Sequence, residues 1–83
     1  MPVRIILFTQ SGCLSCQVMK IFLEAKEVVF EERDMDSDAE ARADLLATYH
    51  STTTPTVVIV TSRGAEVIEG FDPERLDQAL AAA

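Results

Sequence analysis

The most restrictive segment of the sequence is Val3–Phe8, which is apolar at nearly every position and rich in branched side chains. Such a run predicts a strand that is buried on both faces of a sheet, because a strand with one face in water alternates apolar and polar residues. A strand covered on both faces needs further layers above and below it. The chain has 83 residues in all, and those outside this segment must therefore supply helices for the sheet.

Two helices are predicted from apolar residues that recur at three- and four-residue spacings. The first covers Leu14–Lys26, with an inward face expected to consist of Leu14, Val18, Ile21, Phe22 and Ala25, widened by Met19 and Leu23. The second helix is predicted to begin at Ser37, because Ser37 and Glu40 have the spacing of a capping box. Its inner stripe is expected to consist of Ala41 and Leu45, with Thr48 or Tyr49 as a further member.

Three more strands are predicted from composition and turn residues. Val28–Asp34 begins apolar and ends charged, which predicts a second strand running out toward solvent. Thr56–Thr61 contains four consecutive branched apolar residues and is predicted as another central strand. Ser62–Gly64 then predicts a hairpin turn into an outer strand at Ala65–Glu69, since glycine can adopt a positive φ there.

The last helix is predicted from Pro73 toward Ala82, with Asp72 as its N-cap and Leu76 and Leu80 directed inward. The element order is then β-α-β-α-β-β-α. The first two strands must be parallel, because a helix connects them by a right-handed crossover, whereas the last two form an antiparallel hairpin. The predicted fold class is α/β: one domain over residues 1–83, with a four-stranded mixed sheet and three helices.

The charge balance excludes some classes of partner. Seven basic and fourteen acidic residues give a net charge of −7, which argues against a nucleic-acid or anionic-membrane surface. No apolar run approaches the roughly 20 residues of a membrane span. Met1–Leu7 has no basic region followed by a signal-peptide core. We therefore expect a cytoplasmic protein, and a monomer.

An acidic stretch at Glu31–Glu40 holds six carboxylates and a single basic residue, Arg33. Most stretches of this kind are solvated faces. The alternative is a docking patch for a basic reductase or client, in which case the association would depend on salt.

The two cysteines lie between the first strand and the first helix, as Cys13-Leu14-Ser15-Cys16. A two-residue gap at a helix start brings the sulfurs close enough to bond. The first sulfur lies near unpaired amide groups, whose partial positive charge favours the nucleophilic thiolate. Position alone therefore predicts a reactive Cys13 and a deeper, resolving Cys16.

Two other roles for the cysteine pair stay open. A zinc site needs four ligands, and His50 is the only other imidazole or thiol, so a carboxylate or a second chain would have to complete it. His50 is better explained as a favourable charge near a helix C-terminus. A purely structural disulfide is also conceivable, although it is unusual in a cytosolic chain.

These residues, taken together, resemble the glutaredoxins, which have a thioredoxin-like fold. The resemblance covers nearly the whole chain and rests on three motifs in the family's order: Cys13-x-x-Cys16, Thr54-Pro55 before the third strand, and Gly70-Phe71-Asp72 before the last helix. It implies a cis Pro55 beside Cys13 and pairing of the Thr54 backbone with an extended substrate. It also implies that Phe71 and Asp72 meet the amino end of glutathione, a possible co-substrate, with no bound cofactor or metal.

Three departures from the family pattern affect glutathione binding. Gln10 replaces a common lysine, which weakens carboxylate binding, and Leu14-Ser15 replaces the usual Pro-Tyr between the cysteines. Glu69 replaces the first residue of a double glycine and adds negative charge near an anionic ligand. Gln10 and Leu14 are still expected at the substrate site.

With these departures the chain is similar to the glutaredoxin-like donors that serve ribonucleotide reductase and are recharged by thioredoxin reductase, which also carry a Gly-Phe-x-Pro run. The predicted function is a dithiol–disulfide oxidoreductase, a small electron carrier that reduces protein or glutathione mixed disulfides through Cys13 and Cys16. Its partners would be disulfide-containing clients and either glutathione or a flavoprotein reductase. The alternative is an iron–sulfur or metal carrier that uses Cys13, against which the second cysteine counts.

Overall fold

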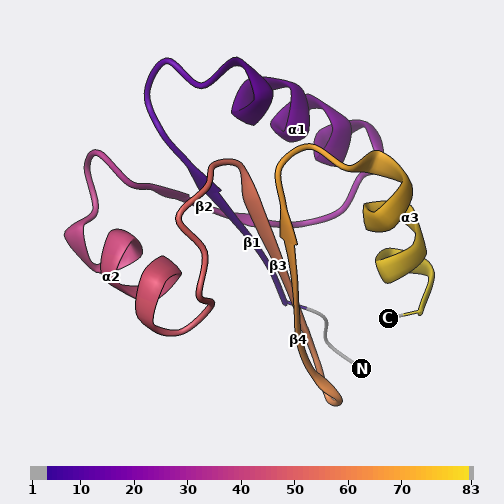
Figure 1. The fold of residues 1–83 in the computed structure, drawn as a ribbon. Coiled ribbons are helices and arrows are strands. Elements are labelled where there is room, and N and C mark those ends of the chain that lie inside the picture. Colours follow the sequence, from indigo (N-terminus) through magenta and orange to yellow (C-terminus); the bar gives the residue numbers. More distant parts are fainter. Residues whose placement is uncertain (1–3, 83) are drawn as a thin grey trace.

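The computed structural model describes residues 4–82, and Val3 lies outside this range. The elements in chain order are β1 (Arg4–Thr9), α1 (Leu14–Ala25), β2 (Glu31–Asp34), α2 (Ala39–Ala47), β3 (Thr56–Thr61), β4 (Gly64–Glu69) and α3 (Pro73–Ala82). The strands form one sheet in the order β2-β1-β3-β4 (Figure 1). β1 and β2 are parallel, and the other two pairs are antiparallel. The predicted α/β, thioredoxin-like architecture is confirmed.

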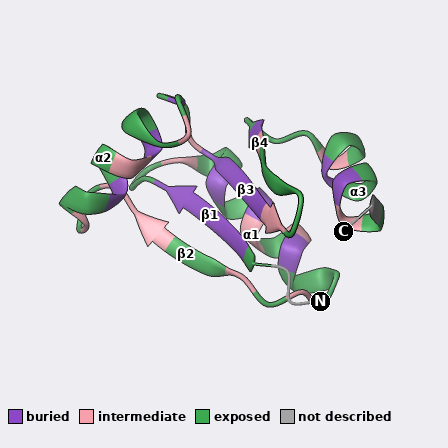
Figure 2. Cartoon of the chain, turned by 90° about the horizontal axis from the view of Figure 1, so that it is seen from below, coloured by how far each residue is buried: buried purple, intermediate pink, exposed green. Residues whose placement is uncertain are grey.

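Alternate residues of β1 enter two separate cores, one on each face of the sheet. Ile5 and Leu7 lie in the core beneath α1 and α3, whereas Ile6 and Phe8 lie in the core beneath α2. Figure 2 shows the resulting pattern, with buried central strands and helices exposed on their outer sides. A strand buried on both faces is what the unbroken apolar run of β1 predicts.

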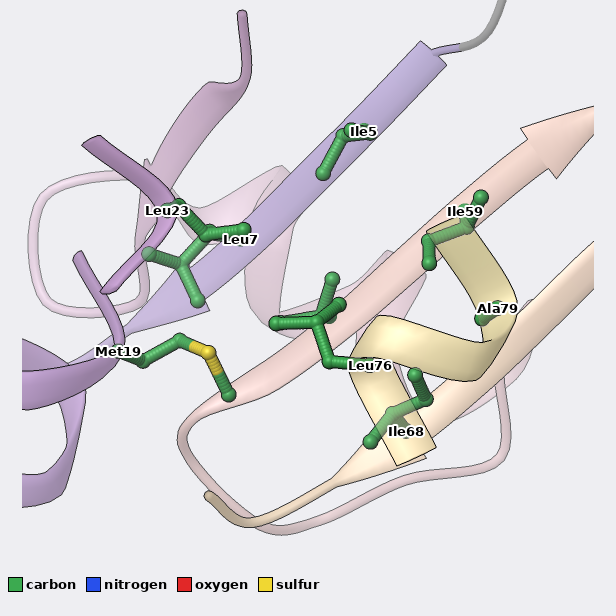
Figure 3. Close-up of a cluster of buried hydrophobic side chains, with 9 residues drawn as sticks. Ile5, Leu7, Met19, Leu23, Ile59, Ile68, Leu76 and Ala79 are labelled. Atoms are coloured by element: carbon green, nitrogen blue, oxygen red, sulfur yellow. The ribbon is translucent and has the colours of Figure 1, made fainter. Parts of the chain in front are cut away.

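The larger core combines the sheet with side chains from α1 and α3 (Figure 3). Its buried members are Ile5, Leu7, Met19, Leu23, Val57, Ile59, Ile68, Leu76 and Ala79. Burial of a Leu, Ile or Met side chain contributes about 1.5–3 kcal/mol. This core therefore holds α1, with the cysteine pair at its start, against the sheet.

Several predicted element boundaries are wrong. By one residue each, β1 ends at Thr9 and not Phe8, α1 ends at Ala25 and not Lys26, and β4 begins at Gly64 and not Ala65. The second strand is Glu31–Asp34, not Val28–Asp34. Val28 packs against the larger core from the preceding loop, while Val29 is 90% exposed. The N-cap of α2 is Asp38 rather than Ser37, because the Asp38 carboxylate accepts hydrogen bonds from the backbone N–H groups of the next turn. At the other end of α2, Tyr49 and not Thr48 packs inward.

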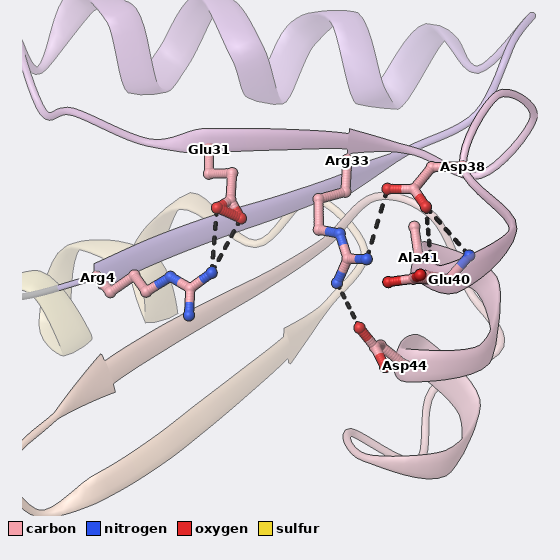
Figure 4. Close-up of polar contacts among 7 residues, drawn as sticks. All are labelled: Arg4, Glu31, Arg33, Asp38, Glu40, Ala41 and Asp44. Carbon is pink, nitrogen blue, oxygen red and sulfur yellow. Dashed lines mark hydrogen bonds and ion pairs between the residues drawn. The ribbon is translucent and has the colours of Figure 1, made fainter.

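The acidic stretch is largely paired within the chain (Figure 4). Glu31 accepts hydrogen bonds from Arg4 on β1. Arg33 contacts Asp44 of α2 at 2.6 Å and Asp38, the N-cap residue of α2, at 3.4 Å, and its guanidinium lies over the Phe8 ring. The Arg33 contacts thus hold α2 against β2, whereas the Glu31 pair joins β2 to β1.

Three strand ends meet at one edge of the sheet. Phe8 near the end of β1 pairs with Thr56 at the start of β3, and Thr56 pairs in turn with Glu69 at the end of β4. The segments that continue beyond this edge are 10–13, 52–55 and 70–72. These are the three segments that carry the predicted site motifs.

Candidate functional site

Cys13 and Cys16 form a disulfide at the start of α1, with their Cα atoms 5.2 Å apart. Cys13 is the N-cap residue, and its Sγ accepts a hydrogen bond of 3.1 Å from the backbone N–H of Cys16. Cys16 is only 3% exposed, whereas Cys13 is partly exposed. The partly exposed first cysteine and the buried second one are the arrangement expected from the sequence.

The loop before Cys13 is fixed from two sides. The Cys13 N–H donates to the carbonyl oxygen of Gln10 at 3.2 Å, which closes a tight turn in which Gly12 has a φ of +77°. The Ser11 N–H donates to the Asp36 carboxylate at 2.9 Å. Hydrogen bonding from the side chain and the backbone N–H of Ser11 lowers the pKa of Asp36 below its ordinary value.

The second motif lies beside this loop. The Thr54–Pro55 peptide bond is cis, Pro55 is buried, and Thr54 is half-buried. The Thr54 hydroxyl donates to the side-chain oxygen of Gln10 at 3.5 Å. Among the described residues, no hydrogen bond uses the backbone N–H or C=O of Thr54. Its backbone is therefore available to an extended partner.

The third motif is attached to the second by its backbone. Gly70 has a φ of +75°, and its N–H donates to the Pro55 carbonyl oxygen at 2.8 Å. Phe71 is 39% exposed and packs edge-on against Phe22 of α1, with ring centroids 5.7 Å apart. One oxygen of Asp72 accepts from the Arg75 N–H, so this carboxylate caps α3.

A chain of hydrogen bonds joins the three motifs. It runs from Gly70 to Pro55 through the backbone, from Thr54 to Gln10 through side chains, and from Gln10 to Cys13 through the tight turn. The structure therefore brings the predicted site residues together at one edge of the sheet. Asp72 is the partial exception, because one of its oxygens serves the helix cap.

The predicted inward face of α1 is confirmed for Met19, Leu23 and Phe22, which pack in or against the larger core, and is wrong for its other members. Leu14, Val18 and Ile21 are 76%, 47% and 65% exposed, and Ala25 is exposed as well. Cys16 is the further buried residue of the helix. Leu14, Val18 and Ile21, called the α1 stripe below, form an exposed apolar row that starts next to Cys13 and follows the helix away from it.

Sequence reasoning also missed a polar group beside Cys16. A pocket of about 170 Å³ is lined by Cys13, Cys16, Lys20, Glu32 and neighbouring residues. Glu32 on β2 accepts a hydrogen bond of 3.0 Å from the Thr9 hydroxyl and forms an ion pair of 3.0 Å with Lys20 on α1. The hydrogen bond from Lys20 lowers the pKa of Glu32, partial burial opposes this shift, and the pKa of Lys20 is raised in return.

The described part of the chain has no metal centre of the usual kind. Within residues 4–82, no group of three or more His, Cys, Asp or Glu side chains is placed to hold a metal ion. His50 follows α2 as an exposed residue with a φ of +56°. None of the helices in the same range is long and apolar enough to cross a membrane.

The sheet order, the helix order and the Cys13–Cys16 pair at the start of α1 define a thioredoxin-fold protein with a CxxC redox centre. A family model described as Glutaredoxin matches residues 5–62, more than half of the chain. The chain therefore belongs to the glutaredoxin family. A search of curated proteins gives no significant match.

Solved structures support this assignment. The thioredoxin-like protein BC3987 is 45% identical, with a TM-score of 0.82 over 90% of this chain and 97% of that one. NrdH-redoxin from Escherichia coli, a glutaredoxin-like protein with a thioredoxin-like activity profile, is 27% identical, with a TM-score of 0.72 over 90% of this chain and 92% of that one. The glutaredoxin grx-1 from Archaeoglobus fulgidus is 25% identical, with a TM-score of 0.72, covering 92% and 84% of the two chains. The family, fold and cysteine pair suggest thiol–disulfide oxidoreductase activity.

Proposed function

We propose that the protein is an electron carrier that reduces protein disulfides through Cys13 and Cys16, and that a thioredoxin-reductase-type flavoprotein recharges it. The observation that carries the proposal is the cysteine pair itself. The two cysteines are bonded at a helix N-terminus, with Cys13 partly exposed and Cys16 buried. Reversible oxidation of these two thiols moves two electrons per cycle.

The reaction follows from the positions of the two sulfurs. In the reduced protein the Cys13 thiolate attacks one sulfur of a client disulfide, forms a mixed disulfide and releases the other client sulfur as a thiolate. The Cys16 thiolate then attacks Cys13 Sγ, which re-forms the Cys13–Cys16 bond and releases the second client thiolate. The client takes up two protons from solvent, and its disulfide is reduced as the protein's dithiol is oxidised. The N–H of Cys16, which contacts Cys13 Sγ at 3.1 Å, stabilises negative charge on the attacking sulfur.

A protein client fits the surface around this centre. The free backbone groups of Thr54 suit the addition of an extended client segment by strand-like pairing. The α1 stripe adds exposed apolar area next to Cys13, which a protein partner would bury. Glutathione is a small polar anion and would leave this stripe uncovered.

Three observations favour a flavoprotein reductase over glutathione as the electron source. Gln10 replaces a lysine that would attract a carboxylate, and Glu69 places a negative charge next to Gly70. The E. coli NrdH-redoxin, whose fold this chain shares, is described as having a thioredoxin-like activity profile. A reductase that carries electrons from NADPH through a flavin and its own dithiol would supply the two electrons of each cycle.

The decisive experiment compares two recharging systems on the same client. Insulin serves as the protein disulfide, with NADPH oxidation followed in the presence of either thioredoxin reductase or glutathione plus glutathione reductase. We expect turnover with thioredoxin reductase to be at least about tenfold faster, a difference of about 1.4 kcal/mol in barrier. Faster turnover with glutathione would replace the proposed electron source while leaving the dithiol mechanism in place.

Cysteine variants test the mechanism separately from the electron source. We expect Cys13→Ser to abolish insulin reduction and Cys16→Ser to accumulate a mixed disulfide with the client, visible by mass spectrometry. Ser62→Ala, an exposed substitution in the β3–β4 hairpin, is the folding control and should keep full activity. Full activity of Cys13→Ser would end the proposal.

A further inference from the structure

A cluster of buried hydroxyl groups lies at the base of the loop 52–55. Ser51 is 2% exposed and Thr56 is completely buried, and their hydroxyl oxygens lie 3.0 Å apart. The Ser51 hydroxyl donates to the Glu69 carboxylate at 3.1 Å. The Thr53 N–H donates to Ser51 Oγ at 3.3 Å, and the Thr56 hydroxyl donates to the carbonyl of Thr53. Ser51, Thr56 and Glu69 are called the Ser51 cluster below.

The Ser51 cluster joins three parts of the fold. Thr56 and Glu69 are cross-strand partners in the β3–β4 ladder, so their side chains lie on the same face of the sheet. Ser51 comes from the segment between α2 and β3, and its N–H donates to the carbonyl of Leu45 on α2 at 3.0 Å. Within the described residues, the cluster leaves no buried side-chain nitrogen or oxygen atom without a partner. Every member of the cluster is therefore hydrogen-bonded, and loss of the Glu69 carboxylate removes the charged acceptor of the Ser51 hydroxyl.

Glu69 is connected to both ends of the loop 52–55, at one end through its side chain and at the other through the next residue in the chain. Its side chain holds Ser51, from which the loop 52–55 begins. The next residue, Gly70, donates its backbone N–H to Pro55 at the other end of that loop. Both ends of the loop that presents Thr54 are thus attached to the end of β4. Between these attachments Thr52 and Thr53 are exposed and have no regular secondary structure.

We infer that Glu69, through Ser51, is a positioning residue that holds the Thr54–Pro55 loop in the conformation that binds a client segment. The inference rests on the proposed function and deepens it. A loop already fixed in its binding conformation does not lose that freedom when the client binds, so binding costs less. It also gives Glu69 a role other than repelling an anionic ligand, since its carboxylate accepts a hydrogen bond from Ser51.

The test compares Glu69→Ala and Ser51→Ala with the conservative variant Glu69→Gln, whose amide can still hydrogen-bond to the Ser51 hydroxyl. For insulin reduction we expect KM to rise about tenfold in both alanine variants, the effect of losing a hydrogen bond to a charged group, with kcat within about twofold. Glu69→Gln should remain within about twofold of the wild type. Glu66→Ala is the matched control, because Glu66 is on the same strand but pairs with Arg75 of α3.

A second measurement does not depend on activity. In Glu69→Ala we expect amide hydrogen exchange at Thr53 and Gly70 to accelerate about tenfold, while exchange at Leu7 in β1 stays unchanged. Unchanged exchange, an unchanged KM, or a defect of equal size in Glu69→Gln would each overturn the inference. If the wild type itself fails to reduce insulin, the proposed function has failed, and the exchange data alone decide whether Glu69 holds the loop.

Discussion

The backbone N–H of Cys16 donates a hydrogen bond of 3.1 Å to the Sγ of Cys13, the residue that caps the same helix. The backbone N–H of Cys16 thus favours negative charge on the Cys13 sulfur. The burial of Cys16 keeps its own sulfur away from an incoming client until Cys13 has reacted. In the reaction proposed above, Cys13 would therefore attack first and Cys16 second.

This arrangement predicts selective alkylation of the reduced protein. With one equivalent of iodoacetamide at pH 7, we expect Cys13 to be modified at least about tenfold faster than Cys16, because a thiolate that is stabilised and accessible reacts first. Peptide mass spectrometry after a short reaction measures the ratio. Equal modification of both cysteines in the folded protein would contradict the assigned roles. The same reaction in 8 M urea, where the helix is absent, is the control and should remove the preference.

The sequence was sufficient to predict the parts of the fold that depend on local patterns. The unbroken apolar runs of β1 and β3, the hairpin glycine and the Asp72-Pro73 start of α3 each mark one element, and the structure has all of them. Their order then leaves little choice of topology, since a helical crossover requires β1 and β2 to be parallel. The site motifs follow the same strand ends, so their proximity was predictable as well.

The buried face of α1 was predictable only in part, because two sets of residues satisfy the helical period equally well and the prediction contained members of both. Leu14, Val18 and Ile21 have spacings of four and three, and Cys16, Met19 and Leu23 have spacings of three and four. Only packing against the sheet decides between them. The polar partners Lys20 and Glu32 are likewise brought together by that packing, since they lie on different elements. At α2, two adjacent residues were both good caps, and Asp38 is the one whose carboxylate reaches the helix N–H groups.

The α1 stripe predicts a surface effect that separates protein clients from small disulfides. We expect Val18→Ser combined with Ile21→Ser to raise KM for insulin about fivefold or more, because an exposed apolar contact would be lost. Reduction of a small, polar disulfide such as hydroxyethyl disulfide should stay within twofold. Glu24→Ala, also exposed on α1, is the matched control. An equal loss on both substrates would show that the stripe does not bind protein partners.

The ion pair between Lys20 and Glu32 predicts a specific pH dependence of stability. The pKa of Glu32 lies below its ordinary value of 4.5, mainly because of the hydrogen bond from Lys20. A carboxyl group whose pKa is lower in the folded than in the unfolded state stabilises the fold. This contribution is complete at pH values above the unfolded-state pKa, and it is lost as the pH falls through the folded-state pKa. We expect Glu32→Gln to be less stable than the wild type by about 0.5–1 kcal/mol at pH 7, because the pair is partly exposed. The difference should shrink as the pH falls below 4.5 and vanish once Glu32 is protonated in the folded state.

Urea unfolding of both proteins between pH 3 and pH 7 measures this effect, and Glu31→Gln provides the control. Glu31 is on the same strand and also forms an ion pair, but its partner is Arg4 of β1 and not a residue of α1. A constant difference between Glu32→Gln and the wild type across the whole pH range would contradict an electrostatic origin.

The smaller core predicts a sharp contrast between two adjacent leucines of α2. Leu45 is 1% exposed and packs with Ile6, Phe8 and Val58, whereas Leu46 is 60% exposed. We expect Leu45→Ala to reduce the free energy of unfolding by about 2–5 kcal/mol, since it removes buried methyl groups and leaves a cavity. Leu46→Ala should change it by less than about 0.5 kcal/mol. Chemical denaturation measures both values, and similar losses in the two variants would mean that α2 does not pack on the sheet as the structure has it.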